Sequence, residues 1–342
     1  MSDTVTSVDA DLVAMMRQVF LDAREKVEEG PLVAGEDLWS ELDELGLVRL
    51  TGDEDSGGSG AGWAEAAELL RAAAGAGVRV PLGEHDLLAC RLLADAGLPA
   101  DDARRTVAEL DAAGTGLAVP WASTAGRIVL LVPRDGGYAV ADVAAGDVRI
   151  TPGTGASEEA RDTVYAAPAV TAGATPVEHR VVAAYRLRAA LVRGVQVSAA
   201  LDRILELTVE HVRDRVQFGR PLARFQAVQH LVADIACEAE LARAATGAAV
   251  ELMAVAGPDD PRTAFAVAVA RSCAGHAASV AVRNAHQALG AIGTTREHRL
   301  HEYTRAALAW RNEFGAVREW DRRVAAAAAD AGGSGLWPLV VD

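Results

Sequence analysis

Apolar residues recur at helical spacing through the first part of the chain. Residues 12–46 predict two helices, the second over residues 36–45, and residues 63–74 and 81–96 predict two more. Between them, residues 53–62 (DEDSGGSGAG) are rich in turn formers and predict an irregular loop. Residues 1–112 are therefore expected to form an N-terminal helical domain.

The hydrophobic period then shortens. Short valine-rich runs separated by Gly and Asp occur at residues 116–119, 127–133, 137–143 and 148–150. Arg134-Asp-Gly-Gly137 between two of these runs is a hairpin-turn signal. Residues 113–180 are expected to form a small antiparallel β-domain.

From residue 181 onward the helical period is long and strong. The apolar stripes cover residues 185–216, 225–254, 261–289 and 297–329. Helices of this length are typical of a bundle, so residues 181–342 are expected to form a C-terminal four-helix bundle. The predicted fold class is mainly α with a small β-domain.

Composition narrows the function classes. Hydrophobic residues make up 51% of the 342 residues but aromatic residues only 4%, which favours helices packed through Ala, Val and Leu. The net charge of −15 and the dispersed basic residues predict no nucleic-acid or membrane partner. The sequence shows no signal peptide and no run of 18 apolar residues, so a cytoplasmic protein is expected.

The sequence predicts no metal site. Cys90, Cys237 and Cys273 stand singly and are expected to be free thiols, because none has a metal-ligand spacing. The pair closest to such a spacing is His298-x-x-His301, which is more typical of a solvated helix face.

One segment at the end of the first long bundle helix combines features that suit an anion. Gly219 permits a sharp turn, and Arg215 places a guanidinium at a helix C-terminus, where it suits a diphosphate. Arg215 would equally complement the helix dipole and pair with an acid. The run Arg215-Val-Gln-Phe-Gly219, with Phe225-Gln-Ala227 after it, resembles the acyl-CoA dehydrogenase family.

Two further segments extend the resemblance over most of the chain. Gln287-Ala-Leu-Gly-Ala-Ile-Gly293 is similar to the family's Gln-x-x-Gly-Gly-x-Gly loop. Gly57-Gly-Ser-Gly60 before a helix resembles the N-terminal domain of the shorter actinobacterial members. The resemblance implies an acyl-CoA dehydrogenase-like fold, FAD as the cofactor, an acyl-CoA thioester as the substrate, and an oligomer of identical or related subunits.

The resemblance also implies cofactor-binding residues, which in the family reach across a dimer interface to the adenosine diphosphate half of FAD. By position these residues are Arg215, Gln217, Phe218, Gln287, Gly290 and Ala291. Ala291 replaces the family's second glycine, and its methyl group is expected to weaken a contact between backbone and phosphate. In the middle domain Trp121, Ser123 and Thr124 are candidates for flavin-ring contacts, although their order differs from the family's.

The family's reaction needs a carboxylate that removes the α-proton of the thioester. The family's two base positions correspond here to Ala189 and to Phe314, which precedes Gly315. Glu313 is one candidate base, but a shift by one residue on a helix turns a side chain by about 100°. His276 is another, since imidazole titrates near neutrality, although a lone His on an apolar helix is more typical of a core residue.

The interpretation favoured here is that the chain has no complete active site and is one half of a heteromeric α2β2 dehydrogenase. A duplicated subunit can lose its base and keep Arg215 and Gln287 for the flavin of its partner. Two alternatives stay open: a catalytically silent structural or regulatory subunit, and an oxygen-using acyl-CoA oxidase relative. For the heteromeric dehydrogenase, the electron acceptor would be an electron-transfer flavoprotein. For the oxidase relative, it would be oxygen.

Overall fold

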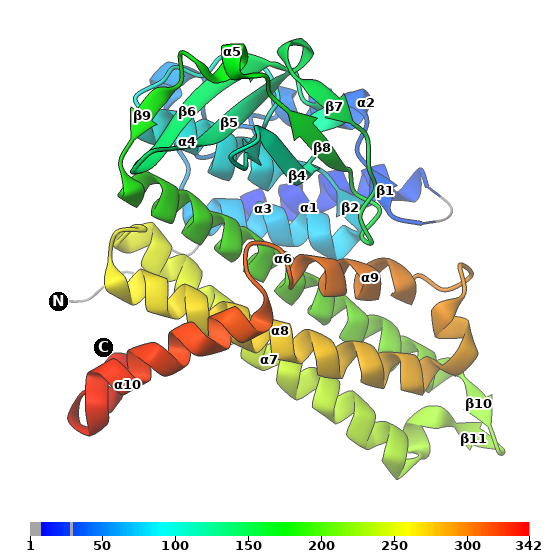
Figure 1. Ribbon diagram of the computed structural model, residues 1–342. Helices are drawn as coiled ribbons and strands as arrows, with labels where there is room; N and C mark the ends of the chain where they lie inside the picture. Colours follow the sequence, from blue (N-terminus) through cyan, green and yellow to red (C-terminus); the bar gives the residue numbers. More distant parts are fainter. Residues whose placement is uncertain (1–7, 28–29, 342) are drawn as a thin grey trace. The chain divides into compact units, whose positions relative to one another are not determined.

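The computed structural model describes residues 8–27 and 30–341 (Figure 1). These residues form two compact units. Unit 1 contains residues 8–27, 30–32, 71–77 and 190–341, and unit 2 contains residues 33–70 and 78–189. This division does not separate the predicted helical domain from the predicted β-domain, whose boundaries stay a prediction.

The larger sheet of unit 2 has four strands in the order β3-β5-β6-β9. They are β3 (Arg105–Glu109), β5 (Arg127–Arg134), β6 (Gly137–Ala144) and β9 (Thr175–Val177). Arg134 pairs with Gly137 at the β5–β6 turn, which confirms the predicted hairpin. The strand pairings within residues 113–180 are antiparallel, as expected, whereas β3, which lies before that range, runs parallel to β5. β3 itself was expected to belong to the helical part.

A second, antiparallel sheet has three strands in the order β4-β8-β7. They are β4 (Thr115–Pro120), β7 (Arg149–Thr151) and β8 (Arg161–Tyr165). Ile128 and Leu130 of β5 and Val164 of β8 lie in one apolar cluster, each fully buried. Short helical segments connect these strands: η3 (Ala122–Thr124), η4 (Ala145–Asp147) and α5 (Pro168–Thr171).

The helical part of unit 2 follows the predicted periodicity with one difference. It contains α2 (Glu36–Glu44), η1 (Glu54–Ser56) and the start of α3 (Trp63–Ala76), with short strands β1 (Leu32–Val33) and β2 (Val78–Arg79). The helix predicted over residues 81–96 begins as a π-helix, η2 (Gly83–Cys90), and continues as α4 (Arg91–Asp95). π-helical turns are rare and often occur at functional sites.

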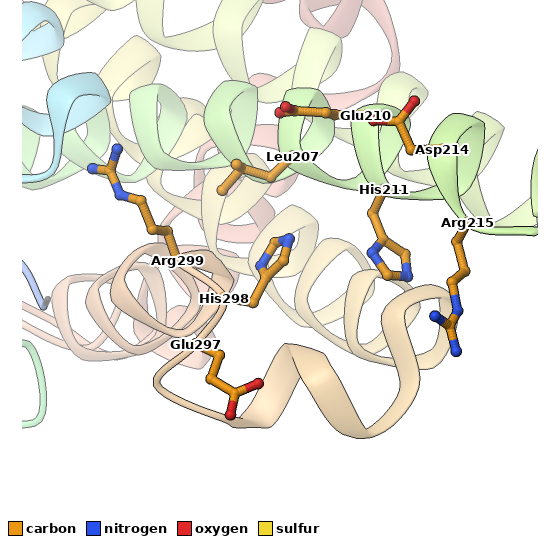
Figure 2. Close-up of a pocket in the computed structure, with 8 residues that line it drawn as sticks. All are labelled: Leu207, Glu210, His211, Asp214, Arg215, Glu297, His298 and Arg299. Atoms are coloured by element: carbon orange, nitrogen blue, oxygen red, sulfur yellow. The ribbon is translucent and has the colours of Figure 1, made fainter. Parts of the chain in front are cut away.

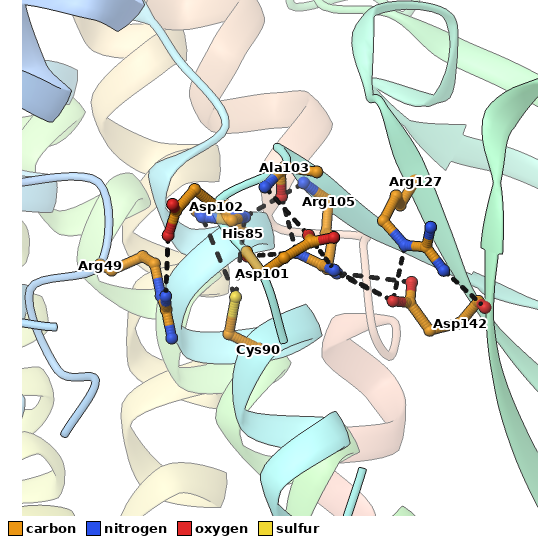
Figure 3. Close-up of polar contacts among 9 residues, drawn as sticks. All are labelled: Arg49, His85, Cys90, Asp101, Asp102, Ala103, Arg105, Arg127 and Asp142. Carbon is orange, nitrogen blue, oxygen red and sulfur yellow. Dashed lines mark hydrogen bonds and ion pairs between the residues drawn. The ribbon is translucent and has the colours of Figure 1, made fainter. Parts of the chain in front are cut away.

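A buried polar network holds η2 against the sheet (Figure 3). His85 of η2 accepts a hydrogen bond at Nδ1 from the backbone N–H of Arg105 at 3.1 Å. The Arg105 guanidinium in turn bonds Asp142 of β6 at 3.0 Å and Asp101 at 2.5 Å. Burial, followed by the charges of nearby arginines, lowers the pKa of His85 to about 3. His85 is therefore neutral at physiological pH, as its acceptor role requires.

Unit 1 is a bundle of long helices (Figure 1). Its helices are α1 (Ala10–Glu25), α6 (His179–Asp214, from residue 190), α7 (Gln226–Val255), α8 (Pro261–Leu289), α9 (Leu300–Trp310) and α10 (Val317–Val341). The last predicted helix, over residues 297–329, was wrong because two helices occupy that range. Phe314 and Gly315 both have positive φ, 53° and 117°, which an α-helix cannot accommodate.

Small residues fill the bundle core. Ala274, Ala277, Ala278, Ala281 and Ala285 of α8 are at most 1% exposed and pack with α6, α7 and α9 in one cluster. Among the described residues, the stretch from α8 into the following turn is long and apolar enough to cross a membrane by composition alone, with half of its most apolar window buried. That burial is what a core helix of a bundle shows. The predicted class, mainly α with a small β part, is confirmed.

Candidate functional site

The segment after α6 forms a small exposed hairpin. β10 (Val216–Gln217) pairs with β11 (Arg220–Pro221), and Phe218 and Gly219 at its tip have φ values of 53° and 77°. Two successive positive φ values are typical of the tightest hairpin turns. A bulky residue seldom adopts such a backbone, and residues of this kind concentrate at functional sites. The Phe218 ring is 90% exposed and contacts only the edge of Phe225 among the described aromatic rings.

Arg215 lies at the base of this hairpin. Its backbone N–H donates to the carbonyl of His211 and closes the last turn of α6. Its guanidinium is exposed and makes no hydrogen bond or ion pair with any other residue that the structure describes. The simpler expectation, that Arg215 pairs with an acid, is therefore not what this chain shows. The guanidinium is available to an anion from outside the chain.

The second motif lies where α8 ends. Gly290 caps the helix with φ of +67°, and a Cβ built there would meet nothing within 4 Å. Glycine is thus needed for its backbone conformation rather than for space. Gln287 and Ala291 are exposed, and Ala291 lies in η6 (Gly290–Thr294).

A cavity of about 470 Å³ lies between the end of α6 and the segment just before α9 (Figure 2). Its lining residues are Leu207, Glu210, His211, Asp214, Arg215, Glu297, His298 and Arg299. The His211 and His298 rings meet edge to face at 5.8 Å. Burial lowers the pKa of both histidines, with the charge of Arg215 adding to the effect on His211. Both rings are therefore neutral near pH 7.

The charges of this cavity decide which part of a cofactor would fit. Three carboxylates, of Glu210, Asp214 and Glu297, and two guanidiniums are among the lining groups, so the net charge of the lining does not suit a diphosphate. The exposed hairpin and turn fit better, because they offer a guanidinium, two side-chain amides and an aromatic ring. Of the six predicted cofactor-binding residues, only Arg215 lines the cavity.

Neither family base position carries a carboxylate that is free to act. Ala189 is fully buried, and Phe314 occupies the position before Gly315. The carboxylate of Glu313 accepts a hydrogen bond from Nε of Arg193 at 2.8 Å. The Arg193 side chain is fully buried, and its guanidinium also bonds Gln196 at 2.6 Å and lies 5.6 Å from the Phe314 ring centre. Glu313 is thus held in a charge pair.

Arg271 holds the same segment by its backbone. This buried side chain donates to the carbonyl oxygens of Glu313 at 2.7 Å and Arg311 at 3.0 Å, with longer contacts to Trp310 and Gly315. Burial, and then the charge of Arg193, lowers the pKa of Arg271 to about 10. Sequence reasoning missed both arginines. The available signal was an Arg among apolar residues, at Arg193 in the first predicted bundle helix and at Arg271 in the third.

The other predicted catalytic residue, His276, lies on the surface of α8. Its side chain is 62% exposed, and its Nε2 lies 3.1 Å from Oδ1 of Asp321. The same carboxylate accepts a hydrogen bond from Ser272, which with His276 lowers the pKa of Asp321. The expectation that a lone histidine here is a core residue was wrong, because this face of α8 points to solvent.

The candidate flavin-ring residues belong to the turn after β4. Trp121 has φ of 58° and is 2% exposed. The backbone N–H of Ser123 donates to the carboxylate of Asp162 at 2.6 Å, which fixes this turn against β8. Their role in cofactor binding stays a prediction.

Comparison with known proteins identifies relatives of the chain. Residues 186–328 match the sequence model described as acyl-CoA dehydrogenase, C-terminal domain. Acyl-CoA dehydrogenase FadE34 of Mycobacterium tuberculosis is 31% identical over 315 residues, which cover 87% of this chain and 43% of FadE34. The chain thus spans less than half the length of this curated relative.

Solved structures share the fold of the whole chain. The ChsE4-ChsE5 complex from Mycobacterium tuberculosis superimposes with a TM-score of 0.83 at 24% identity, covering 96% of this chain and 99% of that one. A glutaryl-CoA dehydrogenase from Mycobacterium smegmatis in complex with FADH2 gives a TM-score of 0.77 at 15% identity, covering 96% and 97%. At these identities the likeness concerns the fold alone, and it confirms the predicted architecture.

Proposed function

The chain belongs to the acyl-CoA dehydrogenase family, and on that premise we propose that it is one subunit of a heteromeric, FAD-dependent acyl-CoA dehydrogenase. The family consists of FAD-dependent oxidoreductases, so the predicted enzyme class and cofactor hold at the level of the family. The complex would convert an acyl-CoA thioester into its trans-2,3-enoyl product.

The observation that carries this proposal is the missing base. The reaction removes a proton from Cα of the thioester while hydride leaves Cβ, and FAD supplies the hydride acceptor when it is bound. In this chain Ala189 and Phe314 occupy the two base positions, and the nearby Glu313 is bound to Arg193. A carboxylate that already accepts a hydrogen bond from a buried guanidinium is not free to take up a proton from a substrate. The base would therefore come from a related subunit.

The cofactor surface has the opposite character, since its residues are retained and exposed. Arg215, Gln217 and Phe218 on the hairpin, with Gln287 and Gly290 at the end of α8, offer groups that suit the diphosphate and adenosine part of FAD. We assign to them the role of completing an FAD site held mainly by the partner. Ala291 would lie at the edge of that contact. A surface that serves a neighbour's cofactor explains an exposed guanidinium and a 90% exposed phenylalanine.

The relatives support a two-part assembly. FadE34 is more than twice as long as the region that this chain matches, and the solved ChsE4-ChsE5 structure is a complex of two differently named chains. We propose that a second, related subunit corresponds to the part of FadE34 that this chain does not match, and that it supplies the base and the main part of the FAD site. An electron-transfer flavoprotein is the proposed electron acceptor, and a cytoplasmic location stays a prediction.

The first test examines the chain by itself. Purified alone, it should carry far less than one FAD per chain and should not reduce added FAD with an acyl-CoA. Stoichiometric flavin that is bleached by an acyl-CoA in the isolated chain would contradict the proposal.

The second test examines the complex. A tagged chain recovered from its natural cells should bring a second family member and FAD with it. Arg215→Ala should weaken FAD binding to the complex by about 10- to 100-fold, as expected for losing a charge-assisted hydrogen bond. Arg213→Ala, an exposed arginine two residues away, is the matched control. Unchanged flavin and activity in Arg215→Ala would favour the silent subunit, and peroxide release during turnover would favour the oxidase.

A further inference from the structure

Unit 2 contains a cavity that the proposed dehydrogenase reaction does not use. It has a volume of about 250 Å³ and shares no lining residue with the cavity at the end of α6. Arg49, Thr51 and Gly52 line one side, and Asp86, Cys90 and Arg91 of η2 and α4 line the other. The volume leaves room for a small molecule of several heavy atoms.

The first unusual feature is the guanidinium of Arg49. The residue is only 7% exposed, and Nη1 makes a long hydrogen bond of 3.4 Å to Asp102, whose own side chain is 91% exposed (Figure 3). Within the described residues this is the only hydrogen bond of the Arg49 side chain, and its Nε is buried without an acceptor. A guanidinium has five N–H donors, and buried donors normally find acceptors. Arg49 is therefore suited to receive an anion.

The second feature is a buried carboxylate across the same cavity. Asp86 is 5% exposed, and its Oδ2 accepts the backbone N–H of Thr51 at 2.9 Å. Arg49 and Asp86 form no ion pair with each other, although both line the cavity. Two opposite buried charges that do not meet are costly unless something bridges them. Burial raises the pKa of Asp86 to about 6, because it outweighs the opposing effects of the Thr51 hydrogen bond and of the charges of Arg49 and Arg91.

We propose that this cavity binds a small carboxylic acid that also carries a hydroxyl or ammonium group. The ligand carboxylate would lie against Arg49, where a planar guanidinium binds it in bidentate fashion. The hydroxyl or ammonium group would donate to Asp86. Arg91, about half exposed and paired with Asp95 at 3.3 Å, would attract the anion at the cavity mouth. α-Hydroxy and α-amino acids of about four carbons have this arrangement of groups.

The test uses the whole purified chain with 2-hydroxybutyrate and 2-aminobutyrate as probes, followed by saturation-transfer NMR and calorimetric titration. At least one of the two probes should bind. Butyrate, which lacks the donor, and 2-butanol, which lacks the carboxylate, should bind about tenfold more weakly or worse. Butyrate binding as tightly as both probes would overturn the proposed ligand class.

Variants then assign the binding to this cavity. Arg49→Met and Asp86→Asn should each weaken the probe by about tenfold or more, because each removes a charge-assisted hydrogen bond. Arg134→Met, on the β5–β6 hairpin and outside the cavity, should leave binding unchanged. Asp86→Asn preserves side-chain shape and carries the test if Arg49→Met fails to fold. No binding of either probe at millimolar concentration, or binding that both variants retain, would overturn the proposal.

Discussion

Two buried arginines in unit 1 are neutralised in different ways. Arg193 meets the carboxylate of Glu313, whereas Arg271 meets several backbone carbonyl oxygens between Trp310 and Gly315. A buried charge is tolerated only when such partners surround it. Both arginines therefore fix the segment that connects α9 and α10. The resemblance predicts one of the two base positions in this segment, and the contacts from both arginines hold it in place.

We predict that Glu313→Ala lowers the free energy of unfolding by about 2–3 kcal/mol. The change leaves the Arg193 guanidinium without its carboxylate in a buried position, and hydrogen bonds to charged groups contribute about this much. Urea denaturation followed by circular dichroism measures the change. If Glu313 were instead a free surface base, its removal would cost little stability.

The control for this change is Glu319→Ala. Glu319 pairs with Arg323 four residues along α10, but both side chains are about half exposed. Surface pairs of this kind contribute about 0.5 kcal/mol or less. Equal effects of the two substitutions on the free energy of unfolding would show that the buried Arg193–Glu313 pair contributes no more stability than a surface pair.

We predict that His85 makes unit 2 less stable as the pH falls. The pKa of His85 is about 3 in the folded chain and 6.5 in the unfolded chain. Below pH 6.5 the unfolded chain therefore binds a proton that the folded chain does not. Stability is therefore lost as the pH falls through 6.5. From pH 7.5 to 5.5 the loss is about 1.4 kcal/mol, and this interval stays above the pI near 5.0.

His85→Asn isolates this effect, because asparagine keeps a hydrogen-bond acceptor for Arg105 but does not titrate. The stability difference between the native chain and His85→Asn should shrink by about 1.4 kcal/mol over that pH interval. Asp86 opposes the trend in both proteins, since its raised pKa adds stability as the pH falls, so it cancels in the comparison.

At the scale of elements, the crossing of α8 and α10 depends on a glycine. A Cβ built on Gly275 of α8 would lie 2.5 Å from Cγ2 of Val317, the first residue of α10. Gly247 in the middle of α7 has nothing within 4 Å of the same position. The two glycines therefore differ in their packing although both lie inside long helices.

We predict that Gly275→Ala destabilises the chain by about 1–3 kcal/mol, the usual cost of overpacking. Gly247→Ala should stabilise it by about 0.5–1 kcal/mol, because alanine favours the helix and meets no neighbour. Chemical denaturation compares the two. Val317→Ala should restore part of the stability in Gly275→Ala, and a failure to do so would contradict the assigned contact.

The differences between predicted and observed elements have physical causes. β8 carries Arg161 and Asp162 in its five residues, so its hydrophobic signal is weak, and only pairing with β4 and β7 makes it a strand. The break between α9 and α10 lies at residues 311–316, where Phe314 gives no local signal of a left-handed backbone. There the contacts from Arg271 hold a conformation that the sequence by itself disfavours.

At the scale of the whole molecule, the residues expected to bind the cofactor are present, whereas the carboxylate expected as the base is not. The predicted cofactor-binding residues lie on an exposed hairpin and a helix end, whereas alanine and phenylalanine stand at the predicted base positions. An oligomer whose sites span two subunits allows this division, because each subunit needs only the half that its neighbour lacks.

The sequence by itself determined the long helices, the hairpin and the motif residues, because these follow from periodicity, turn chemistry and spacing along the chain. That Ala189 and Phe314 stand at the family's base positions stays a prediction from the resemblance. Only the tertiary structure decided that Glu313 is bound to Arg193, that Arg215 is without a partner in the described chain, and that Arg49 and Asp86 face one cavity without pairing. These contacts join side chains that lie far apart in the sequence, so the local sequence does not specify them.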